Sequence, residues 1–238
     1  MNKGRFTLLG RVSVLIVVLV AALGCSASAS FFEGFDSEAS FSNWNGWGPV
    51  GTWDTISGGQ LTMTPPAIND GLWVTSNQTF LYGTYEIRMR FDNTPWNWSY
   101  FGFFNRSPWT VPIACMRTDV NLMLAAGDGV GSNWDALNPN SPVLAPNEWH
   151  TIKIIWQPGS IESVYDGTSL GTYTTYVAST AMPIVLDVGR GQYSSAPAVF
   201  EVDYVKVDDY VPVPEPSALA SLAAMSGMLG VLIRRRMR

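Results

Sequence analysis

The chain has 238 residues, with 19 acidic and 14 basic side chains and a formal net charge of −5. Between Ser30 and Tyr210 there are 18 acids and 7 bases, a balance of −11. A domain this acidic repels nucleic acid and anionic membrane surfaces, so neutral sugars or cations are easier partners. The single histidine, His150, excludes a metal site built from several histidines.

The first 29 residues have the three parts of a secretory signal peptide. Lys3, Arg5 and Arg11 precede an apolar run over residues 12–23, and Ala27-Ser28-Ala29 follows it. A basic segment, a short apolar segment and an Ala-x-Ala site are the pattern that a signal peptidase cleaves. We therefore expect export of the chain and cleavage after Ala29.

A lipoprotein signal is the alternative at this end. Ala22-Leu23-Gly24-Cys25 resembles a lipobox, in which Cys25 would carry the lipid. In both cases the chain leaves the cytoplasm. The chain has two cysteines, so when Cys25 departs with the signal, Cys115 remains and no intrachain disulfide can form.

Residues 30–210 predict one all-β domain of about 180 residues, large enough for a sizeable core. Runs rich in β-branched and aromatic residues alternate with clusters of Gly, Pro, Asn and Asp, which favours a sandwich or barrel. Asp166-Gly167 predicts a hairpin turn, and residues 126–147 predict a surface loop. The predicted strands cover residues 59–64, 72–76, 82–91, 99–105, 118–124, 149–157, 161–165, 184–189 and 200–207.

The predicted strand over residues 82–91 alternates regularly. Apolar residues occupy positions 85, 87, 89 and 91, and polar or charged residues occupy the even positions between 84 and 90. Successive side chains of a strand point to opposite faces, so this strand buries one face and presents a polar one. A strand that lines a ligand groove has this pattern, and so does a strand with a plain solvent face.

Five segments in order along the chain match one known superfamily. They are residues 82–91, 98–104 and 147–156, the hairpin through Asp166-Gly167, and residues 200–207. Together they resemble the concanavalin A-like lectin/glucanase superfamily, and most of all glycoside hydrolase family sixteen. The resemblance implies an all-β jelly-roll sandwich of two antiparallel sheets, of which the concave one holds a glycan.

The segment that would carry catalysis departs from that family. The family has Glu-x-Asp-x-Glu on one concave strand, where the first Glu is the nucleophile and the last is the acid/base. The aligned residues are Arg117-Thr118-Asp119-Val120-Asn121, so Arg117 and Asn121 replace the two glutamates. A guanidinium cannot attack an anomeric carbon, and an amide is no useful proton donor near neutral pH. We expect the hydrolytic pair to be lost and a polar row to remain on one strand face.

The expected function is binding of an extracellular polysaccharide without hydrolysis. Two alternatives stay open: a glycosidase that uses displaced acids, with Asp128, Asp135 and Asp187 as candidates, and a structural matrix protein without a glycan site. Glu86 and Arg88 could instead form a structural ion pair with Arg117 or Asp119. The carbohydrate-binding candidates are Glu86, Arg88, Trp98, Tyr100, Arg117, Asp119, Asn121 and Trp134.

No cofactor is expected to be required, and a structural Ca²⁺ is possible. Many relatives in the resembled family bind calcium away from the groove. Glu33 near the first strand and Asp203 in the last one are the candidate ligands, because Ca²⁺ prefers oxygen ligands.

Residues 211–238 have the parts of a sorting signal. Val213-Pro214-Glu215-Pro216 is followed by an apolar run over residues 218–233 and a basic tail over residues 234–238. The run has 16 residues, fewer than the ~20 that a membrane-spanning helix needs. A single-span tail anchor is the alternative.

This block resembles the PEP-CTERM sorting signal of Gram-negative bacteria. In that family the membrane protease exosortase is thought to cut near the Pro-Glu-Pro motif. The resemblance implies a signal helix at one end and a hydrophobic sorting helix at the other, with transient anchoring in the inner membrane. Signal peptidase and exosortase are then partners during export, and the cell surface or the extracellular matrix is the destination.

Overall fold

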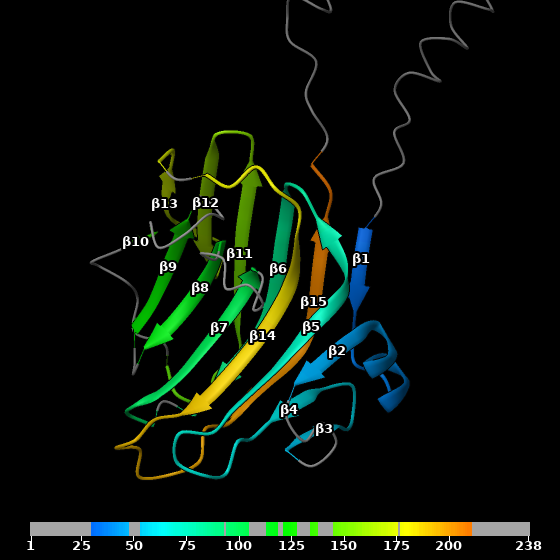
Figure 1. Cartoon of the computed structure of the whole chain (residues 1–238), viewed down its shortest axis with the longest axis vertical. Helices are drawn as coiled ribbons and strands as arrows, with labels where there is room; N and C mark the ends of the chain where they lie inside the picture. The colour runs from blue at the N-terminus through cyan, green and yellow to red at the C-terminus, as the bar shows by residue number, and fades with distance from the viewer. Residues whose placement is uncertain are drawn as a thin grey trace, which may run out of the picture.

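The computed structural model describes residues 30–47, 53–92, 94–104, 113–118, 121–127, 134–137, 145–175 and 177–210 (Figure 1). The predicted signal helix over residues 1–29 and the predicted sorting helix over residues 211–238 lie outside these residues. In the described part of the chain, no helix is long and apolar enough to cross a membrane.

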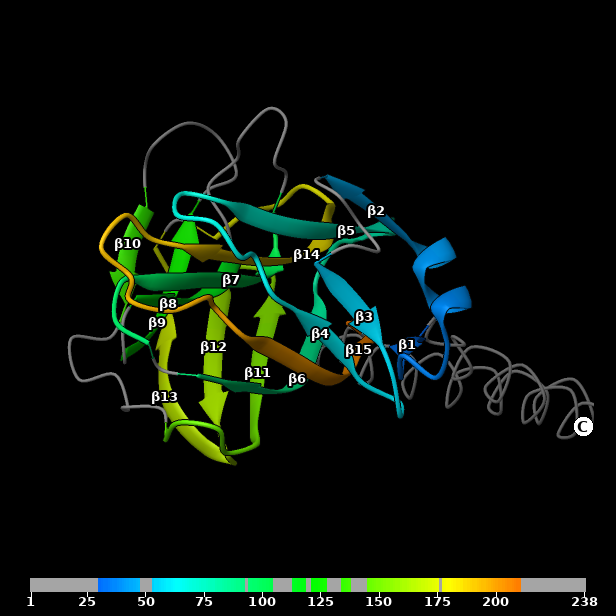
Figure 2. The same cartoon turned by 90° about the horizontal axis from the view of Figure 1, so that it is seen from below.

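The chain folds into two antiparallel sheets that pack face to face, as Figure 2 shows from the end. The first sheet has eight strands. In spatial order they are β13 (Thr168–Tyr173), β12 (Ser160–Tyr165), β11 (His150–Gln157), β6 (Gly83–Phe91), β15 (Phe200–Asp208), β4 (Leu61–Met63) and β3 (Asp54–Ile56), with β1 (Ser30–Glu33) also paired to β15.

The second sheet has seven strands. In spatial order they are β10 (Trp134–Leu137), β9 (Asn121–Gly127), β8 (Ile113–Thr118), β7 (Asn97–Phe103), β14 (Met182–Arg190), β5 (Gly71–Phe80) and β2 (Trp44–Trp47). A short 3-10 helix, Glu38–Asn43, precedes β2. This confirms the predicted jelly-roll sandwich of two antiparallel sheets.

The core lies between the two sheets and follows the period of two in the sequence. On β6 the side chains of Tyr85, Ile87 and Met89 are fully buried, while the residues between them are half-buried on the other face. Trp156 of β11 is also buried, and its indole N–H donates a hydrogen bond to the carbonyl of Ala178 at 3.0 Å. Burial of such apolar faces is the main force that holds the two layers together.

The predicted hairpin turn at Asp166-Gly167 is confirmed, whereas two other predicted segments differ from the structure. Both residues have positive φ values, 45° and 81°, as a tight hairpin between β12 and β13 requires. The predicted loop over residues 126–147 is wrong in part, because it contains β10. The predicted strand over residues 118–124 is also wrong at its start, because β8 ends at Thr118 and β9 begins at Asn121.

Candidate functional site

The outward face of the seven-stranded sheet carries a group of aromatic side chains. On β5, β14 and β7, the residues that alternate with the core point away from it, because successive side chains of a strand face opposite sides. Val185 and Phe104 form a second buried cluster there, and Trp73 and Tyr100 pack against it. We call the group of Trp73, Trp98, Tyr100, Val185, Asp187 and Gly189 the candidate face.

Asp187 lies in the middle of the candidate face. The strand register places it opposite Trp73 of β5 on one side and Tyr100 of β7 on the other. Opposing side chains in an antiparallel pair lie about 4.5–5.5 Å apart at their Cβ atoms. Asp187 is 1% exposed, so its carboxylate lies beneath the surface and the half-buried rings beside it reach the solvent. Its position suits it to orient these rings.

The indole of Trp98 packs over Gly189 of the neighbouring strand. The register pairs it with Gly189, and an ideal Cβ at residue 189 would stand 2.0 Å and 2.1 Å from two carbon atoms of the indole. The absence of a side chain at Gly189 therefore makes the space in which the indole rests. A half-buried ring on a sheet surface offers a flat apolar platform.

Two of the predicted carbohydrate-binding residues, Trp98 and Tyr100, lie on this face and close together along β7. Trp134 is in β10, at the far edge of the same sheet and three strands from β7, and its side chain is outside the described part of the structure. Trp73 and Gly189 were missed. Alternation turns Trp73 and Asp187 each away from the apolar neighbours in its own strand, but it does not say that the two strands pair in one sheet.

Glu86 and Arg88 do not join this face. They lie on β6, in the eight-stranded sheet, and point away from the core on the other side of the sandwich. They therefore lie apart from Trp98 and Tyr100, and their part in glycan binding stays a prediction. The alternative expected an ion pair with Arg117 or Asp119, whereas Glu86 pairs with Lys153 at 2.8 Å and Arg88 pairs with Asp203.

A polar network surrounds these two residues on the outward face of the eight-stranded sheet. Burial alone would raise the pKa of Glu86, but hydrogen bonds from Lys153 and Tyr204 and the charges of Lys153 and Lys206 outweigh it, so the pKa is lowered. Arg90 forms a two-pronged ion pair with Glu201. The guanidinium groups of Arg88 and Arg90 lie 5.0 Å and 4.8 Å from the ring centre of Trp149. Ion pairs and cation–π contacts of this kind are typical of a solvent-facing sheet surface whose charged side chains pair with one another.

The predicted row of Arg117, Asp119 and Asn121 on one strand is wrong. Arg117 belongs to β8 and Asn121 to β9, and Thr118 is paired with Asn121 across the hairpin. A turn between two strands breaks the alternation that would have aligned the three side chains. Asp119 lies outside the described residues, as do the side chains of Arg117 and Asn121, so their part in glycan binding stays a prediction.

The two predicted calcium ligands already have protein partners. The carboxylate of Glu33 accepts hydrogen bonds from the N–H of Phe35 at 2.9 Å and from the side chain of Asn43 at 3.1 Å. Asp203 is ion-paired with Arg88, a fixed positive charge. Within the described residues, no three His, Cys, Asp or Glu side chains gather around a possible metal position. The calcium site stays a prediction.

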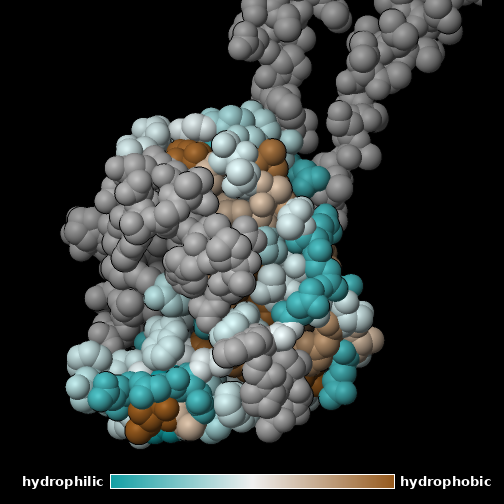
Figure 3. Space-filling model, in the orientation of Figure 1, coloured by the Kyte–Doolittle hydropathy of each residue, from teal (hydrophilic) through white to brown (hydrophobic). Residues whose placement is uncertain are grey.

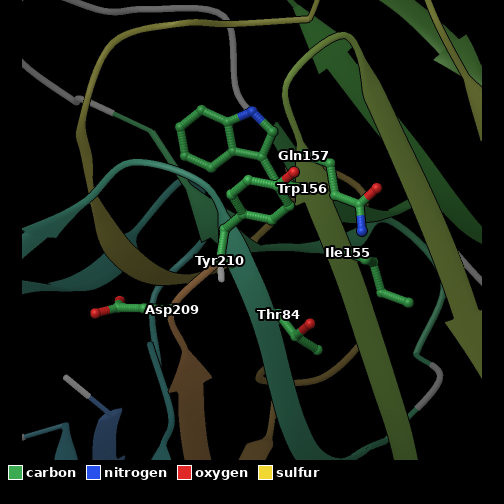
Figure 4. A pocket seen from close by; sticks show the side chains of 7 residues that line it. Thr84, Ile155, Trp156, Gln157, Asp209 and Tyr210 are labelled. Atoms are coloured by element: carbon green, nitrogen blue, oxygen red, sulfur yellow. The ribbon is translucent and has the colours of Figure 1, made fainter. Parts of the chain in front are cut away.

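One pocket in the described part of the structure lies away from the candidate face. It encloses about 270 Å³ where β6 begins, β11 ends and the chain leaves β15, and Figure 4 shows its lining residues, among them Trp156, Asp209 and Tyr210. None of the predicted site residues lines it. Its position at the exit of the chain separates it from the candidate face.

Comparison with known proteins places the chain among glucanase-like folds. No family model matches it. It is 28% identical over 141 residues to "Beta-glucanase" of Bacillus licheniformis, a match that covers 56% of this chain and 57% of that protein. The chain thus matches little more than half the length of this curated relative.

Solved structures extend the likeness over most of the described chain. The beta-glucanase of Bacillus licheniformis superimposes with a TM-score of 0.62 at 19% identity, covering 78% of this chain and 100% of that one. The laminarinase from Flavobacterium sp. UMI-01 gives 0.61 at 16%, covering 75% and 99%. A Crh5 transglycosylase in complex with NAG gives 0.64 at 15%, covering 78% and 86%. The chain therefore has the jelly-roll fold of the beta-glucanases, with detectable sequence similarity to one of them.

Proposed function

We propose that this chain is an exported protein that binds a neutral polysaccharide on the candidate face and does not hydrolyse it. The observation that carries the proposal is the set of half-buried rings of Trp73, Trp98 and Tyr100 around one buried carboxylate. The C–H faces of pyranose rings suit aromatic platforms, and a few fixed polar groups give orientation. Glucanases and a laminarinase with the same fold act on glucans, as their names state, which supports a polysaccharide ligand.

The charge of the domain supports a neutral ligand. A balance of −11 over residues 30–210 disfavours phosphorylated or sulfated polymers, which would be repelled. The described surface on the side seen in Figure 3 is mainly hydrophilic, with small separate hydrophobic areas. A hydrated, uncharged chain of sugars fits such a surface.

The positions of the acidic residues support binding without hydrolysis. Glycosidases need two carboxyl groups about 5–5.5 Å apart for retention or about 6.5–9.5 Å for inversion. In the strands of the seven-stranded sheet the sequence has two acids, Asp187 on β14 and Asp135 on β10. Four strand spacings of about 4.8 Å put them roughly 19 Å apart. Asp187 is also buried, at 1% exposure, where a sugar does not reach it.

Two other functions remain to be separated from this one. A glycosidase would need Asp187 to become accessible and to work with a loop acid such as Asp128, which lies outside the described residues. A structural matrix protein would have the same fold with no glycan affinity. Both predict different results in one experiment.

The test incubates the secreted, mature protein with lichenan, laminarin, agarose and carrageenan. Retention on a neutral polysaccharide of the panel without release of reducing ends is the expected result, with no retention on the sulfated carrageenan, and Trp98→Ala should abolish the retention. Phe32→Ala is the matched control, because Phe32 is an exposed ring (64%) on the eight-stranded sheet. Release of reducing ends would establish an enzyme, and no retention on any polymer would favour the structural protein.

Export and surface sorting complete the proposal. They are supported by the tripartite first 29 residues and by the Pro214-Glu215-Pro216 motif with its apolar run and basic tail. Signal peptidase and exosortase would process the chain, which would be held briefly in the inner membrane of a Gram-negative bacterium before it reaches the cell surface or matrix.

Intact-mass measurement of secreted protein tests the processing. The expected product begins at Ser30 and lacks the tail 234–238, and alanine substitution of Pro214, Glu215 and Pro216 should leave the tail attached. A lipid on Cys25 would replace cleavage after Ala29 with lipoprotein processing. A full-length C-terminus in the outer fraction would overturn the sorting proposal.

A further inference from the structure

A second aromatic group lies at the end of the seven-stranded sheet, beside the candidate face. Trp96 precedes β7 and Tyr193 follows β14, and their rings meet edge to face with centroids 5.4 Å apart. Trp96 is 55% exposed and Tyr193 is 69% exposed. The last residue pair of the two strands, Asn97 with Arg190, lies directly next to them. We call Trp96 and Tyr193 the aromatic pair.

The backbone of Trp96 is strained, and burial does not offset the strain. Its φ is 69°, in the left-handed region that a bulky residue seldom adopts. Phe35 has a similar φ of 51°, but its ring is 1% exposed and stacks against Trp44. Burial of Phe35 can hold that residue in its strained form, whereas Trp96 keeps its form with more than half of its surface in water. Strain of this kind gathers where a residue is held for binding.

Contacts between two loops fix this conformation. The N–H of Asn97 donates to the carbonyl of Thr94 at 3.3 Å, and its side-chain amide donates to the carbonyl of Ala196 at 3.4 Å. The carbonyl oxygen of Trp96 comes so close to Gly191 that a Cβ there would stand 2.0 Å from it. The loop before β7 and the loop after β14 are therefore locked together, and the indole is held outward before any ligand arrives.

We infer that the aromatic pair is a second platform for a pyranose ring, which extends the binding of a neutral polysaccharide beyond the candidate face. This rests on the proposed function. Trp98 lies in β7 and Trp96 directly precedes this strand, and the carbonyl of Trp96 approaches Gly191, two residues beyond the Gly189 over which Trp98 packs. The aromatic pair thus adjoins the Trp98 end of the candidate face, and a short oligosaccharide on that face would leave the pair unused.

The test compares a long ligand with a short one. Laminarihexaose and laminaribiose are titrated into the secreted protein and into two variants, Trp96→Asn and Tyr193→Ala. Loss of one aromatic contact should weaken the hexasaccharide about two-fold to ten-fold and leave the Kd of the disaccharide unchanged. Phe32→Ala, an equally exposed ring on the other sheet, is the control for both ligands.

Thermal unfolding adds a readout that separates binding from structure. Asn tolerates the left-handed region, so Trp96→Asn should keep or raise Tm while it weakens the hexasaccharide. A ring retained only for packing would show the opposite, a lower Tm with unchanged affinity.

The outcomes distinguish this inference from the proposed function. If both variants bind the hexasaccharide like the parent while Trp98→Ala does not, the aromatic pair is no binding site and the proposed function stands. Equal losses for the two ligands would also overturn the inference, because the effect would not depend on length. If the parent binds neither ligand, the inference is wrong, and the polysaccharide panel decides separately on the proposed function.

Discussion

The indole of Trp98 rests directly on Gly189, where an ideal Cβ would come within 2.0 Å of the ring. The two residues are paired across β7 and β14, so the ring lies across the neighbouring strand. Because Gly189 has no side chain, the indole of Trp98 can occupy the space above it, and this fixes where the indole lies.

Gly189→Ala should displace the indole and weaken glycan binding. The added methyl group cannot share the space with Trp98, and overpacking of this kind costs about 1–3 kcal/mol of unfolding free energy. Chemical denaturation and affinity for the retained polysaccharide measure the two effects.

Gly71→Ala is the matched control for that change. Gly71 is paired with Gly189 on β5, and the atom nearest to its ideal Cβ is a carbonyl oxygen at 3.8 Å, an ordinary contact. It should leave affinity unchanged. If the two alanine variants lost affinity equally, the packing of Trp98 over Gly189 would not be what determines binding.

Asp187→Asn should destabilise the fold, and neither the parent nor the variant should hydrolyse polysaccharide. The carboxylate is buried, at 1% exposure, and Asp187 interacts with other residues. Asparagine is a weaker partner for the residues that interact with Asp187, so the substitution should lower the free energy of unfolding by about 1–3 kcal/mol. Urea denaturation measures the loss, and reducing-end assays should stay at background.

Asp208→Asn serves as the control for Asp187. Asp208 is half exposed (47%) and pairs with Lys206 on the other sheet, so its change should stay within about 0.5 kcal/mol. Turnover by the parent that Asp187→Asn abolishes would instead favour the glycosidase.

Glu86 should make the stability of the fold depend on acid. Its pKa is lowered from 4.5 in the folded state, because the contacts with Lys153 and Tyr204 outweigh the burial that would raise it. The unfolded chain therefore takes up the proton first, and stability present above pH 4.5 is lost as the pH falls through the lower folded value. Glu86→Gln should flatten this part of the curve of unfolding free energy against pH. Glu38→Gln, on the exposed 3-10 helix, is the control substitution.

Tyr204 should have the corresponding effect in alkali. Burial and the hydrogen bond to Glu86 raise its pKa from 10.0 to about 12. Between these values the unfolded chain has lost the phenol proton and the folded chain keeps it, so stability falls as the pH rises. Tyr204→Phe should lower stability at neutral pH by about 0.5–1.5 kcal/mol, for one lost hydrogen bond, and make the alkaline decline shallower. A variant with an unchanged decline would contradict this assignment. Tyr193→Phe, at an exposed tyrosine, is the control.

The sequence was most informative where one strand could be read by itself. Alternation correctly assigned the buried and polar faces of β6. It failed at residues 117–121, where β8 ends at Thr118 and β9 begins at Asn121, because no Gly or Pro in this segment separates the two strands in the sequence.

Membership of a sheet could not be predicted from alternation. The pattern of β6 says that Glu86 and Arg88 face away from the core, but it does not say on which side of the sandwich. That depends on the pairing of β6 with β11 and β15, strands far away in the sequence. The same holds for the position of Gly189 beneath Trp98, which follows from the register between β7 and β14.

The pairing of β1 with β15 sets how the molecule would stand on a surface. Ser30 is paired with Asp208, so the chain enters and leaves the described domain at one end of the sandwich (Figure 1). β15 runs from there to Phe200 at the opposite end, a span of roughly 30 Å for nine residues. Trp96 and Tyr193 lie in the loops at that opposite end. If the chain is tethered through its C-terminal tail, as proposed, the attachment point and the aromatic pair lie at opposite ends of the sandwich. The two rings would then face away from the membrane, with no need for a domain rotation.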